Sequence, residues 1–395
     1  FDGLVVSPGV PLNTHPITSQ AKRYGVRIIG DIELFAQARA ELLPHKVVGV
    51  TGTNGKSTTV ALVDHILRMA GIPSVLGGNI GEPILAQEPL APNERGVGVY
   101  VLELSSYQID LTHSLDCEAA ALTNITPDHL DRYDGFDAYA ASKARLFEMQ
   151  SARHLAVFGT GDEPCGGFLE AERERRFKDR VALADMAALA ELQHEWPTLQ
   201  GPHNLQNAAV AIALVEELGV TQAQWQHALP RFRNLPHRME FVGVDDGVTF
   251  INDSKATNTA SSAPALAAYP PGANGPRIHW IVGGLAKEDG LGECAAQLGH
   301  VAAAYTVGEA GPRFADLIEE RGHRVERCEL ISEAVRRAQE AARSGDVILF
   351  SPACASFDQF RDYEKRGEHF RQLVGVMADC APAPEGPGPA RDQAA

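Results

Sequence analysis

The stretch VVGVTGTNGKSTT, residues 47–59, decides the fold. An apolar run ends at small residues and glycines, and apolar residues with helical spacing follow, so the pattern predicts a strand, a tight loop and a helix. Gly52 and Gly55 allow backbone N–H groups to approach phosphate oxygens. At the positive end of the helix, Lys56 adds a point charge and Ser57 adds a hydroxyl ligand for Mg²⁺. The stretch therefore predicts a site for a nucleoside triphosphate, which we interpret as ATP.

The spacing of this loop differs from the strict phosphate-loop pattern GxxxxGK[ST]. Val50 occupies the position of the first glycine, so that the shorter pattern GxxGKS remains. A glycine-rich turn alone would be a weak signal. Here a strand, a loop, the Lys-Ser pair and a helix follow one another directly. An accidental match would need all four features together, so the pattern favours a phosphate-binding loop.

Composition limits the other classes of function. The chain has 395 residues, which at about 100 to 200 residues per domain favours two to four domains. It carries 35 basic and 51 acidic residues, a net charge of −16, and no block of basic residues interrupts this excess. The charge therefore argues against binding of nucleic acid.

The cysteines and the hydropathy pattern predict a cytoplasmic protein that does not contact membranes. The sequence has no signal peptide and no apolar run near 18 residues. The cysteines show no CxxC pair and no metal-ligand spacing, so we expect reduced thiols rather than disulfides or a zinc site. These cysteines are Cys117, Cys165, Cys294, Cys328, Cys354 and Cys380.

Strand and helix patterns alternate along the chain, which predicts an α/β fold with three domains. Residues 1–38 contain one strand pair, too little for a stable sheet, and are predicted to be a truncated N-terminal Rossmann-like domain. Residues 39–234 are predicted to form a central parallel sheet of the P-loop ATPase type. Residues 235–380 are predicted to form a C-terminal Rossmann-like domain. The Pro- and Gly-rich residues 381–395 are predicted to be disordered.

Two charged residues stand out in the central domain. Glu103 ends the apolar strand predicted at 99–102, where a carboxylate would hold Mg²⁺ opposite Ser57; the alternative is an ordinary solvated glutamate. Lys143 lies between Tyr139 and Phe147 on one face of a predicted helix. Such a lysine usually extends its ammonium to solvent, but this face is expected to pack on the phosphate-loop sheet, where a sheltered lysine would be functional.

Eight motifs, taken in order, resemble those of the Mur ligases, the ATP-dependent amide-forming enzymes of peptidoglycan synthesis. The resemblance extends from Ser7 to about Leu373. The last two motifs are most similar to the branch of the family that joins D-glutamate to UDP-N-acetylmuramoyl-L-alanine. The motifs lie at 52–58, 77–81, 102–106, 128–129, 203–207, 236–238, 252–258 and 351–358.

The resemblance implies an acyl-phosphate mechanism with ATP and Mg²⁺. It also implies that the domain of residues 1–38 binds a UDP substrate and that the domain of residues 235–380 binds an amino acid. It implies catalytic roles for Lys56, His129 and Lys143, and a carbamate on Lys143. The implied ATP contacts are Gly52, Thr53, Asn54, Gly55, Lys56, Ser57, Thr58, Asn207, Arg238 and Asp253. The implied metal ligands are Ser57, Glu103, His129 and Lys143. The implied substrate contacts are Ser7, Gly9, Asn79, His129, Thr257, Lys287, Ser356, Phe357 and Tyr363. His237 and Lys255 are further candidates, and Tyr363 stands where the family more often has phenylalanine.

Other functions fit parts of the same pattern. Another Mur-type amino-acid ligase or a ligase similar to folylpolyglutamate synthetases would share the phosphate loop and the central domain. A P-loop kinase for small molecules and a nucleotide-dependent switch are hypotheses from other classes. Against these two stands a complete third domain, which simple phosphoryl transfer does not need. We expect a monomer that acts on small molecules.

Overall fold

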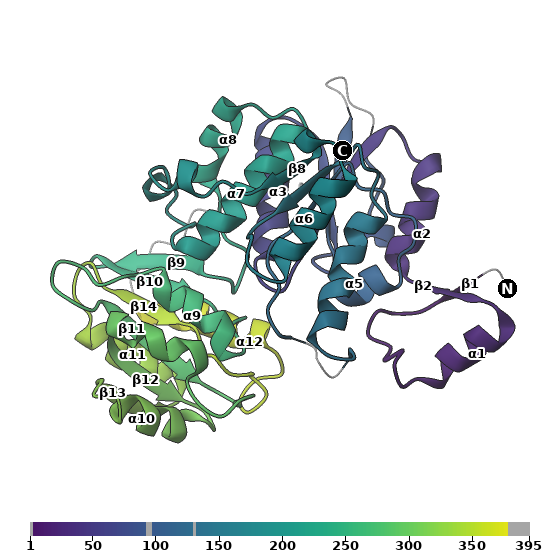
Figure 1. The fold of residues 1–395 in the computed structure, drawn as a ribbon. Helices are drawn as coiled ribbons and strands as arrows, with labels where there is room; N and C mark the ends of the chain where they lie inside the picture. Colours follow the sequence, from purple (N-terminus) through teal and green to yellow (C-terminus); the bar gives the residue numbers. More distant parts are fainter. Residues whose placement is uncertain (1–2, 92–96, 129–131, 378–395) are drawn as a thin grey trace, which may run out of the picture. The chain divides into compact units, whose positions relative to one another are not determined.

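The computed structural model describes residues 3–91, 97–128 and 132–377. The predicted site residue His129 and the predicted tail 381–395 lie outside these ranges. The chain divides into two compact units, Phe1–Pro197 with His203–Phe232, and Thr198–Pro202 with Arg233–Ala395. We call them unit 1 and unit 2. Figure 1 draws unit 1 in purple to teal and unit 2 in green to yellow.

Unit 1 contains a six-stranded sheet in which all strand pairs are parallel, as the sequence predicted. The strand order is β4-β5-β3-β6-β7-β8. The strands are β3 (His45–Thr51), β4 (Ser74–Gly78), β5 (Gly98–Glu103), β6 (Ala119–Leu122), β7 (Leu155–Phe158) and β8 (Val181–Leu183). The edge strand β8 was not predicted, because only three residues beside a charged segment carry no recognisable period.

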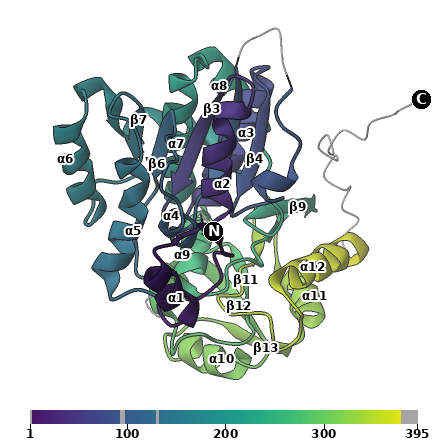
Figure 2. The same ribbon diagram turned by 90° about the vertical axis from the view of Figure 1, so that its right-hand side faces the viewer.

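Helices cover both faces of this sheet. Figure 2 shows the helices around this sheet. On one face, α2, α5 and α6 join the strands in a single apolar cluster that contains Phe35, Tyr139, Leu146 and Leu169. The helices of unit 1 are α1 (Pro16–Tyr24), α2 (Asp31–Ala38), α3 (Lys56–Met69), α4 (Ser106–Asp110), α5 (Phe136–Glu148), α6 (Cys165–Arg175), α7 (Pro202–Glu217) and α8 (Gln222–Ala228). Its short 3-10 helices are Arg39–Glu41, Ile84–Ala86, Lys178–Arg180, Ala187–Leu189, Gln193–Glu195 and Leu229–Arg231.

The first residues form a separate parallel pair, β1 (Gly3–Val5) and β2 (Arg27–Ile29). The predicted boundary of a domain at residue 38 stays a prediction. The carboxylate of Glu33 in α2 accepts hydrogen bonds from the backbone N–H of His113 (2.7 Å) and of Ser114 (2.9 Å). These bonds fix α2 to the segment that follows α4.

Unit 2 contains a second six-stranded sheet, in the order β13-β12-β11-β14-β10-β9. The strands are β9 (Glu240–Asp245), β10 (Val248–Asn252), β11 (Ile278–Gly283), β12 (Val301–Val307), β13 (Val325–Glu329) and β14 (Val347–Phe350). Neither β9 nor β13 was predicted. β9 runs antiparallel to β10, so the sheet is mixed at this edge. Only one residue of β9, Gly243, is buried, so the strand leaves no apolar pattern in the sequence.

Two apolar clusters form the core of unit 2, one on each face of the sheet. Trp280 and Val282 belong to one cluster, and the alternate strand residue Ile281 belongs to the other. The helices are α9 (Thr259–Ala267), α10 (Gly311–Glu319), α11 (Ile331–Ala341), α12 (Tyr363–Met377) and the 3-10 helix Gly292–His300. Each unit therefore has its own core.

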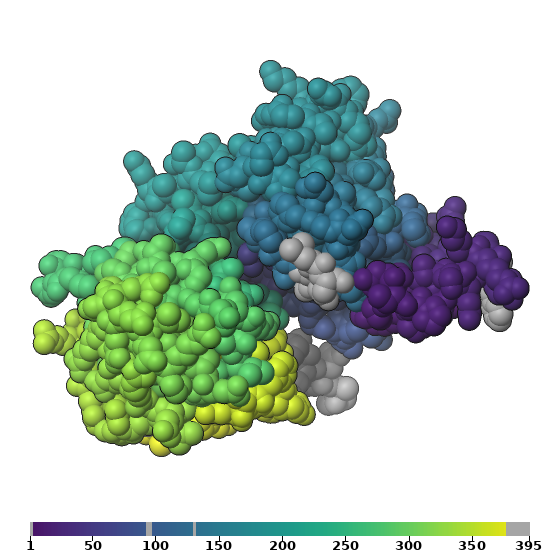
Figure 3. Space-filling view, turned by 60° about the horizontal axis from the view of Figure 1, so that its bottom comes forward, coloured from purple at the N-terminus to yellow at the C-terminus, as the bar shows by residue number. Residues whose placement is uncertain are grey.

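The space-filling view shows the surface of both units in the same colours (Figure 3). Within the described ranges, no helix combines the length and the apolar character that a membrane span requires.

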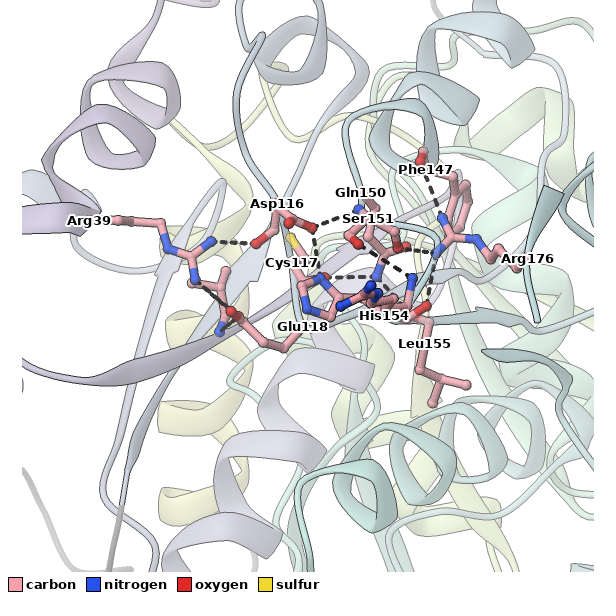
Figure 4. A network of polar contacts seen from close by, with 12 residues as sticks. Arg39, Asp116, Cys117, Glu118, Phe147, Gln150, Ser151, His154, Leu155 and Arg176 are labelled. Carbon is pink, nitrogen blue, oxygen red and sulfur yellow. Dashed lines mark hydrogen bonds and ion pairs between the residues drawn. The ribbon is translucent and has the colours of Figure 1, made fainter. Parts of the chain in front are cut away.

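A polar network lies where strands of the unit 1 sheet begin (Figure 4). The Glu118 carboxylate, directly before β6, accepts hydrogen bonds from the Arg39 guanidinium at 2.9 and 3.0 Å and from the backbone N–H of Val47 at 2.6 Å. Arg39 also donates to the Asp116 carbonyl. One half-buried carboxylate therefore joins the segment after α2 to β3 and β6.

The same network continues along the sheet. Arg176 donates to the carbonyls of Ser151 and His154, both at 2.8 Å. Gln150 donates to the Cys117 carbonyl (2.8 Å) and the Leu155 carbonyl (2.9 Å), so that it bridges the chain before β6 and the start of β7 (Figure 4). Side chains therefore fix the loops at this end of the sheet. Ligands of parallel α/β sheets bind at the opposite edge, where the strands have their carboxyl-terminal ends.

We predict that Glu118→Ala lowers the stability of the protein by about 2 kcal/mol, because the Arg39 charge and the Val47 N–H lose their acceptor. The thermal midpoint should fall by roughly 4 to 8 °C for a unit of this size. Glu170→Ala is the matched control, since its carboxylate forms an exposed pair with Arg173. Differential scanning calorimetry should show little change for the control, and equal midpoints for both variants would contradict the role of Glu118.

Candidate active site

The phosphate loop has the predicted strand-loop-helix form, with β3 ending at Thr51 and α3 beginning at Lys56. Gly52 has φ of 142° and Gly55 has φ of 85°, which other residues rarely adopt. A Cβ atom on Gly52 would overlap the Thr123 hydroxyl, and one on Gly55 would overlap the Asn207 side chain. Both glycines are therefore required by backbone conformation and by space.

The residues after β6 hold this loop, and the sequence analysis had not given them a role. The Asn124 carbonyl accepts from Thr53 N at 2.8 Å, and its side-chain oxygen accepts from Asn54 N at 2.9 Å. The Thr123 hydroxyl donates to the Asn54 carbonyl at 2.7 Å. The polar pair Thr123-Asn124 directly after an apolar strand is a sequence signal for such a role, because β3 and β6 end at the same sheet edge.

Two lysines donate to the same loop carbonyl. The Lys56 ammonium lies 3.0 Å from the Gly52 carbonyl oxygen and 2.8 Å from that of Thr53. Lys143, from α5, lies 2.8 Å from the Gly52 carbonyl oxygen. Only 2% of Lys143 is exposed, and its ammonium lies 4.6 Å from the centroid of the Tyr139 ring. The interpretation that Lys143 extends to solvent is therefore wrong.

The environment of Lys143 changes its protonation. Burial, followed by the nearby positive charge of Lys56, lowers the pKa of Lys143 to about 7. The carboxylates of Asp128, Asp110 and Glu103 act in the opposite direction. A large fraction of Lys143 is therefore a neutral amine at neutral pH, which makes its nitrogen nucleophilic.

Glu103 and Ser57 suit a magnesium ion. Glu103, at the end of β5, is 2% exposed, and one carboxylate oxygen accepts from the Asn79 amide at 2.9 Å. The other oxygen, Oε2, is buried and has no hydrogen-bond partner among the described residues. Ser57 is buried in the first turn of α3. A free carboxylate oxygen and a hydroxyl are the hard oxygen ligands that Mg²⁺ prefers, and nucleotide phosphates complete such sites.

In the parts of the chain that the structure describes, no group of three or more His, Cys, Asp and Glu side chains is arranged to hold a metal. One protein carboxylate with a hydroxyl is the pattern of a nucleotide-linked magnesium site.

Asn207 lies against the phosphate loop. It is buried on α7, its side-chain oxygen accepts from the Thr59 hydroxyl at 3.4 Å, and its amide donates to Asn204 at 3.3 Å. These bonds place the side chain close to Gly55. Its predicted contact with the nucleotide stays a prediction.

Ser7 and Gly9 lie in the loop that follows β1. The guanidinium of Arg132 donates to the carbonyls of Gly9 (3.3 Å) and Val10 (2.8 Å) and lies 4.2 Å from the centroid of the Tyr107 ring. Arg132 was not among the predicted site residues. A cavity of about 680 Å³ adjoins Arg132 and Tyr107, and none of the predicted site residues lines it.

In unit 2, His237 and Asp253 are buried in one polar cluster. The Asn252 amide donates to His237 Nδ1 at 3.0 Å. The Asp253 carboxylate accepts from the backbone N–H of Met239 at 3.1 Å and from the Ser351 hydroxyl at 2.7 Å. Burial raises the pKa of Asp253 to about 7. The structure thus brings the predicted residue Asp253 to the end of β10, beside the segment that carries His237.

The predicted amino-acid contacts form two pairs in unit 2. Lys287 donates to the Thr257 hydroxyl at 3.2 Å, and Lys255 donates to the Tyr363 hydroxyl at 2.9 Å. Ser356 is buried, whereas Phe357 is 70% exposed.

Backbone bonds connect the Lys287 loop with the Ser356 loop. Leu285 and Ala355 exchange two backbone hydrogen bonds of 2.9 Å. Gly283 and Gly284, with φ of 131° and 134°, turn the chain at the end of β11 and make this pairing possible. The two loops are thus joined at one edge of the sheet.

Arg366 is a buried residue that the sequence analysis missed. It donates to the Ser254 carbonyl at 2.8 Å and the Cys354 carbonyl at 3.0 Å, so it joins the loops after β10 and β14. Burial lowers the pKa of Arg366 to about 10. In the sequence it is one arginine among several charged residues of α12, which explains why no pattern marked it.

Comparisons with known proteins identify the family. Residues 50–215 match the Mur ligase middle domain, and residues 237–354 match the glutamate ligase domain of Mur ligases. The chain belongs to the Mur ligase family. It is an ATP-dependent ligase, as the sequence predicted.

Individual relatives agree with this assignment. A UDP-N-acetylmuramoylalanine–D-glutamate ligase of Novosphingobium aromaticivorans is 60% identical over 390 residues, which cover 98% of this chain and 85% of the relative. The ligase of the same name from Sphingopyxis alaskensis is 56% identical over 377 residues, covering 95% and 85%. The crystal structure of the UDP-N-acetylmuramate–alanine ligase of Thermotoga maritima has a TM-score of 0.62 at 18% identity, covering 95% of this chain and 86% of that one, and confirms the α/β fold.

Gly55→Ala should weaken ATP binding at least about tenfold, because the new methyl group overlaps Asn207 and distorts the loop. Gly219→Ala is the matched control: its φ is 93°, but a Cβ there meets no atom within 4 Å. Both substitutions impose backbone strain of about 1 to 2 kcal/mol. Calorimetric titration with ATP should show the loss only for Gly55→Ala, and an equal loss in both variants would contradict the close fit at Asn207.

Proposed function

We propose that this protein joins D-glutamate to UDP-N-acetylmuramoyl-L-alanine, with hydrolysis of ATP to ADP and phosphate, in cytoplasmic synthesis of the peptidoglycan precursor. The substrate assignment rests on the 60% identity over 390 residues to a relative with that activity in its name. The chemistry is supported by one arrangement in unit 1, the two lysines on the Gly52 carbonyl beside the buried Glu103 carboxylate. We further propose that the protein acts as a monomer.

The first step activates a carboxylate. An oxygen of the L-alanine carboxylate attacks the γ-phosphorus of ATP, the bond to the β–γ bridging oxygen breaks, and an acyl phosphate and ADP form. Both reactants are anions, so the site must hold them together and offset their charge. The Lys56 ammonium and the backbone N–H groups of the loop bind the transferred phosphoryl group.

Ser57 and Glu103 would hold a magnesium ion, which would supply positive charge that offsets the charge of the phosphate oxygens. Asn79 fixes one Glu103 oxygen and so leaves the other free for the ion. His129 is proposed, from the family resemblance, to serve a second metal and the muramoyl end of the substrate.

The second step forms the amide bond. The D-glutamate amine attacks the acyl carbonyl carbon, phosphate leaves with the bonding electrons, and the amine loses a proton. We propose that Lys287 and Thr257 bind one carboxylate of D-glutamate, and that the segment of Ser356 and Phe357 binds the other side together with Tyr363. The hydrogen bonds Lys287–Thr257 and Lys255–Tyr363 support this, because each presents an ammonium next to a hydroxyl. Arg238 and Asp253 remain proposed contacts of the nucleotide.

Lys143 is proposed to carry a carbamate. The neutral amine attacks CO₂, a C–N bond forms as one C–O π bond of CO₂ breaks, and a proton is released. The lysine side chain then ends in a carboxylate instead of an ammonium group, and a carboxylate suits a magnesium site. The low pKa of about 7 and the burial of Lys143 support this step. Because the ammonium cannot attack CO₂, the modification should be lost as the pH falls below about 7.

Amino-acid dependence of ADP release distinguishes the ligase from the other functions. With UDP-N-acetylmuramoyl-L-alanine and ATP present, we expect ADP release to rise by at least about tenfold on addition of D-glutamate and not of L-glutamate, because amide formation frees the site for the next turnover. A kinase would release ADP without any amino acid, and a nucleotide switch would turn over slowly in every mixture. Either of those results would contradict the proposed function.

Replacing Lys143 tests the carbamate. We expect Lys143→Ala to lower the ligase rate by about 100-fold or more, since a charged ligand near the transferred phosphoryl group is lost. Acetate should restore part of the activity in proportion to its concentration, because a free carboxylate fills the vacated space. Lys178→Ala, which removes an exposed lysine of the same unit, is the control. Full activity of Lys143→Ala without acetate would refute the role of this side chain.

A further inference from the structure

A second cavity lies in unit 2, at the end of the sheet where β11, β12 and β14 begin. Its volume is about 420 Å³. The proposed substrate loops lie at the opposite edge of the sheet, where they follow the ends of β10, β11 and β14 at Asn252, Gly283 and Phe350. Ligands of α/β sheets bind at those carboxyl-terminal ends, so this cavity is separate from the proposed amino-acid site.

Three arginines line the cavity, Arg277, Arg324 and Arg343, together with one acidic residue, Asp346. This excess of positive charge contrasts with the chain as a whole, whose net charge is −16. The Asp346 carboxylate is already engaged, since it accepts from the backbone N–H of Arg343 at 2.8 Å and contacts His279 Nε2 at 3.3 Å. The cavity therefore favours an anion.

The arginines retain donors for a ligand. Within the described residues, the guanidinium of Arg277 forms a hydrogen bond only through Nε, which donates to the Pro270 carbonyl at 3.0 Å. The side chain of Arg343 makes no hydrogen bond to those residues, although its backbone N–H donates to Asp346. Arg324 donates one bond to Glu326 at 2.6 Å. Several N–H groups of guanidinium ions remain available, and paired guanidinium donors match the geometry of phosphate oxygens.

The backbone around Arg277 is rigid. Arg277 N donates to the His300 carbonyl at 3.2 Å, and the Arg277 carbonyl accepts from Val347 N at 2.9 Å, so this residue is fixed between the starts of β12 and β14. Gly272 and Gly275 close the preceding turn through two mutual hydrogen bonds of 2.9 and 3.0 Å. The Arg277 side chain therefore projects from a preorganised position.

His279 is the buried polar residue of the cavity lining. Its Nδ1 lies 3.0 Å from the Tyr305 hydroxyl and its Nε2 lies 3.3 Å from the Asp346 carboxylate. Burial lowers the pKa of His279, so the ring is neutral near pH 7. The ring can then donate to Asp346 and accept from Tyr305, which holds the carboxylate in place.

We propose that this cavity binds a small metabolite that carries a phosphate or diphosphate group, recognised by Arg277, Arg324 and Arg343. The volume of about 420 Å³ lies in the range of about 300 to 1,000 Å³ that is typical of small-molecule sites. The site takes part in neither the phosphoryl transfer nor the amide formation. It therefore does not depend on the proposed function.

Calorimetric titration of the full chain with pyrophosphate tests the site, in a Lys56→Ala background that weakens binding at the phosphate loop. We expect one remaining site with a Kd below about 1 mM. Arg277→Gln and Arg343→Gln should each weaken it about tenfold or more, whereas Arg321→Gln, an exposed arginine of unit 2 outside the cavity, should leave it unchanged. Thermal midpoints close to that of the parent protein would show that the variants are folded.

Three results would overturn the proposal. The first is absence of pyrophosphate binding in the Lys56→Ala protein. The second is that the Arg277→Gln and Arg343→Gln variants bind pyrophosphate with the same affinity as that parent protein. The third is that citrate binds as tightly as pyrophosphate, which would show that the site attracts anions without selecting phosphate. Titrations with inorganic phosphate and with a sugar phosphate distinguish a site for free phosphate from a site for a phosphorylated metabolite. Tighter binding of the sugar phosphate would indicate contacts beyond the arginines.

Discussion

The carbonyl oxygen of Gly52 is the point on which the candidate active site depends. It accepts hydrogen bonds from the ammonium groups of Lys56 and Lys143, which come from two different helices. Placing two ammonium groups on one oxygen brings their charges close together, and the pKa of Lys143 falls in response, after the larger effect of burial. One backbone atom thus determines both the position of the phosphate-binding lysine and the reactivity of its neighbour.

The two ends of the unit 1 sheet have different tasks. At one end, Glu118, Gln150 and Arg176 satisfy the loops around the strand starts with hydrogen bonds. At the other end, the Asn124 side chain holds the phosphate loop through hydrogen bonds with the backbone of Asn54. These bonds do not involve the first turn of α3. A rigid sheet between the two ends keeps the loop, Glu103 and Lys143 in fixed relative positions. Preorganised groups of this kind stabilise developing charge without further rearrangement.

The sequence predicted what local patterns encode. An apolar run identified β5, which was predicted at 99–102 and lies at Gly98–Glu103, and the 47–59 stretch identified the phosphate loop. Short or edge strands such as β8, β9 and β13 were missed, since few of their residues are buried. Arg366 was missed because its importance lies in contacts with residues far along the chain. Asn124 was missed although its place directly after an apolar strand is a signal, because its bond to Asn54 is visible only in the structure. Lys143 was recognised as unusual, but only the structure shows that its ammonium binds the Gly52 carbonyl.

In the proposed mechanism, the groups around Gly52 activate a carboxylate by phosphorylation before the amide bond forms. The most direct measurement uses UDP-N-acetylmuramoyl-L-alanine labelled with ¹⁸O in its carboxylate, together with ATP and D-glutamate. The oxygen that attacks phosphorus stays with the phosphoryl group when the amine displaces it. The account predicts that each inorganic phosphate released carries one labelled oxygen. Release of unlabelled phosphate, with amide product formed, would contradict it.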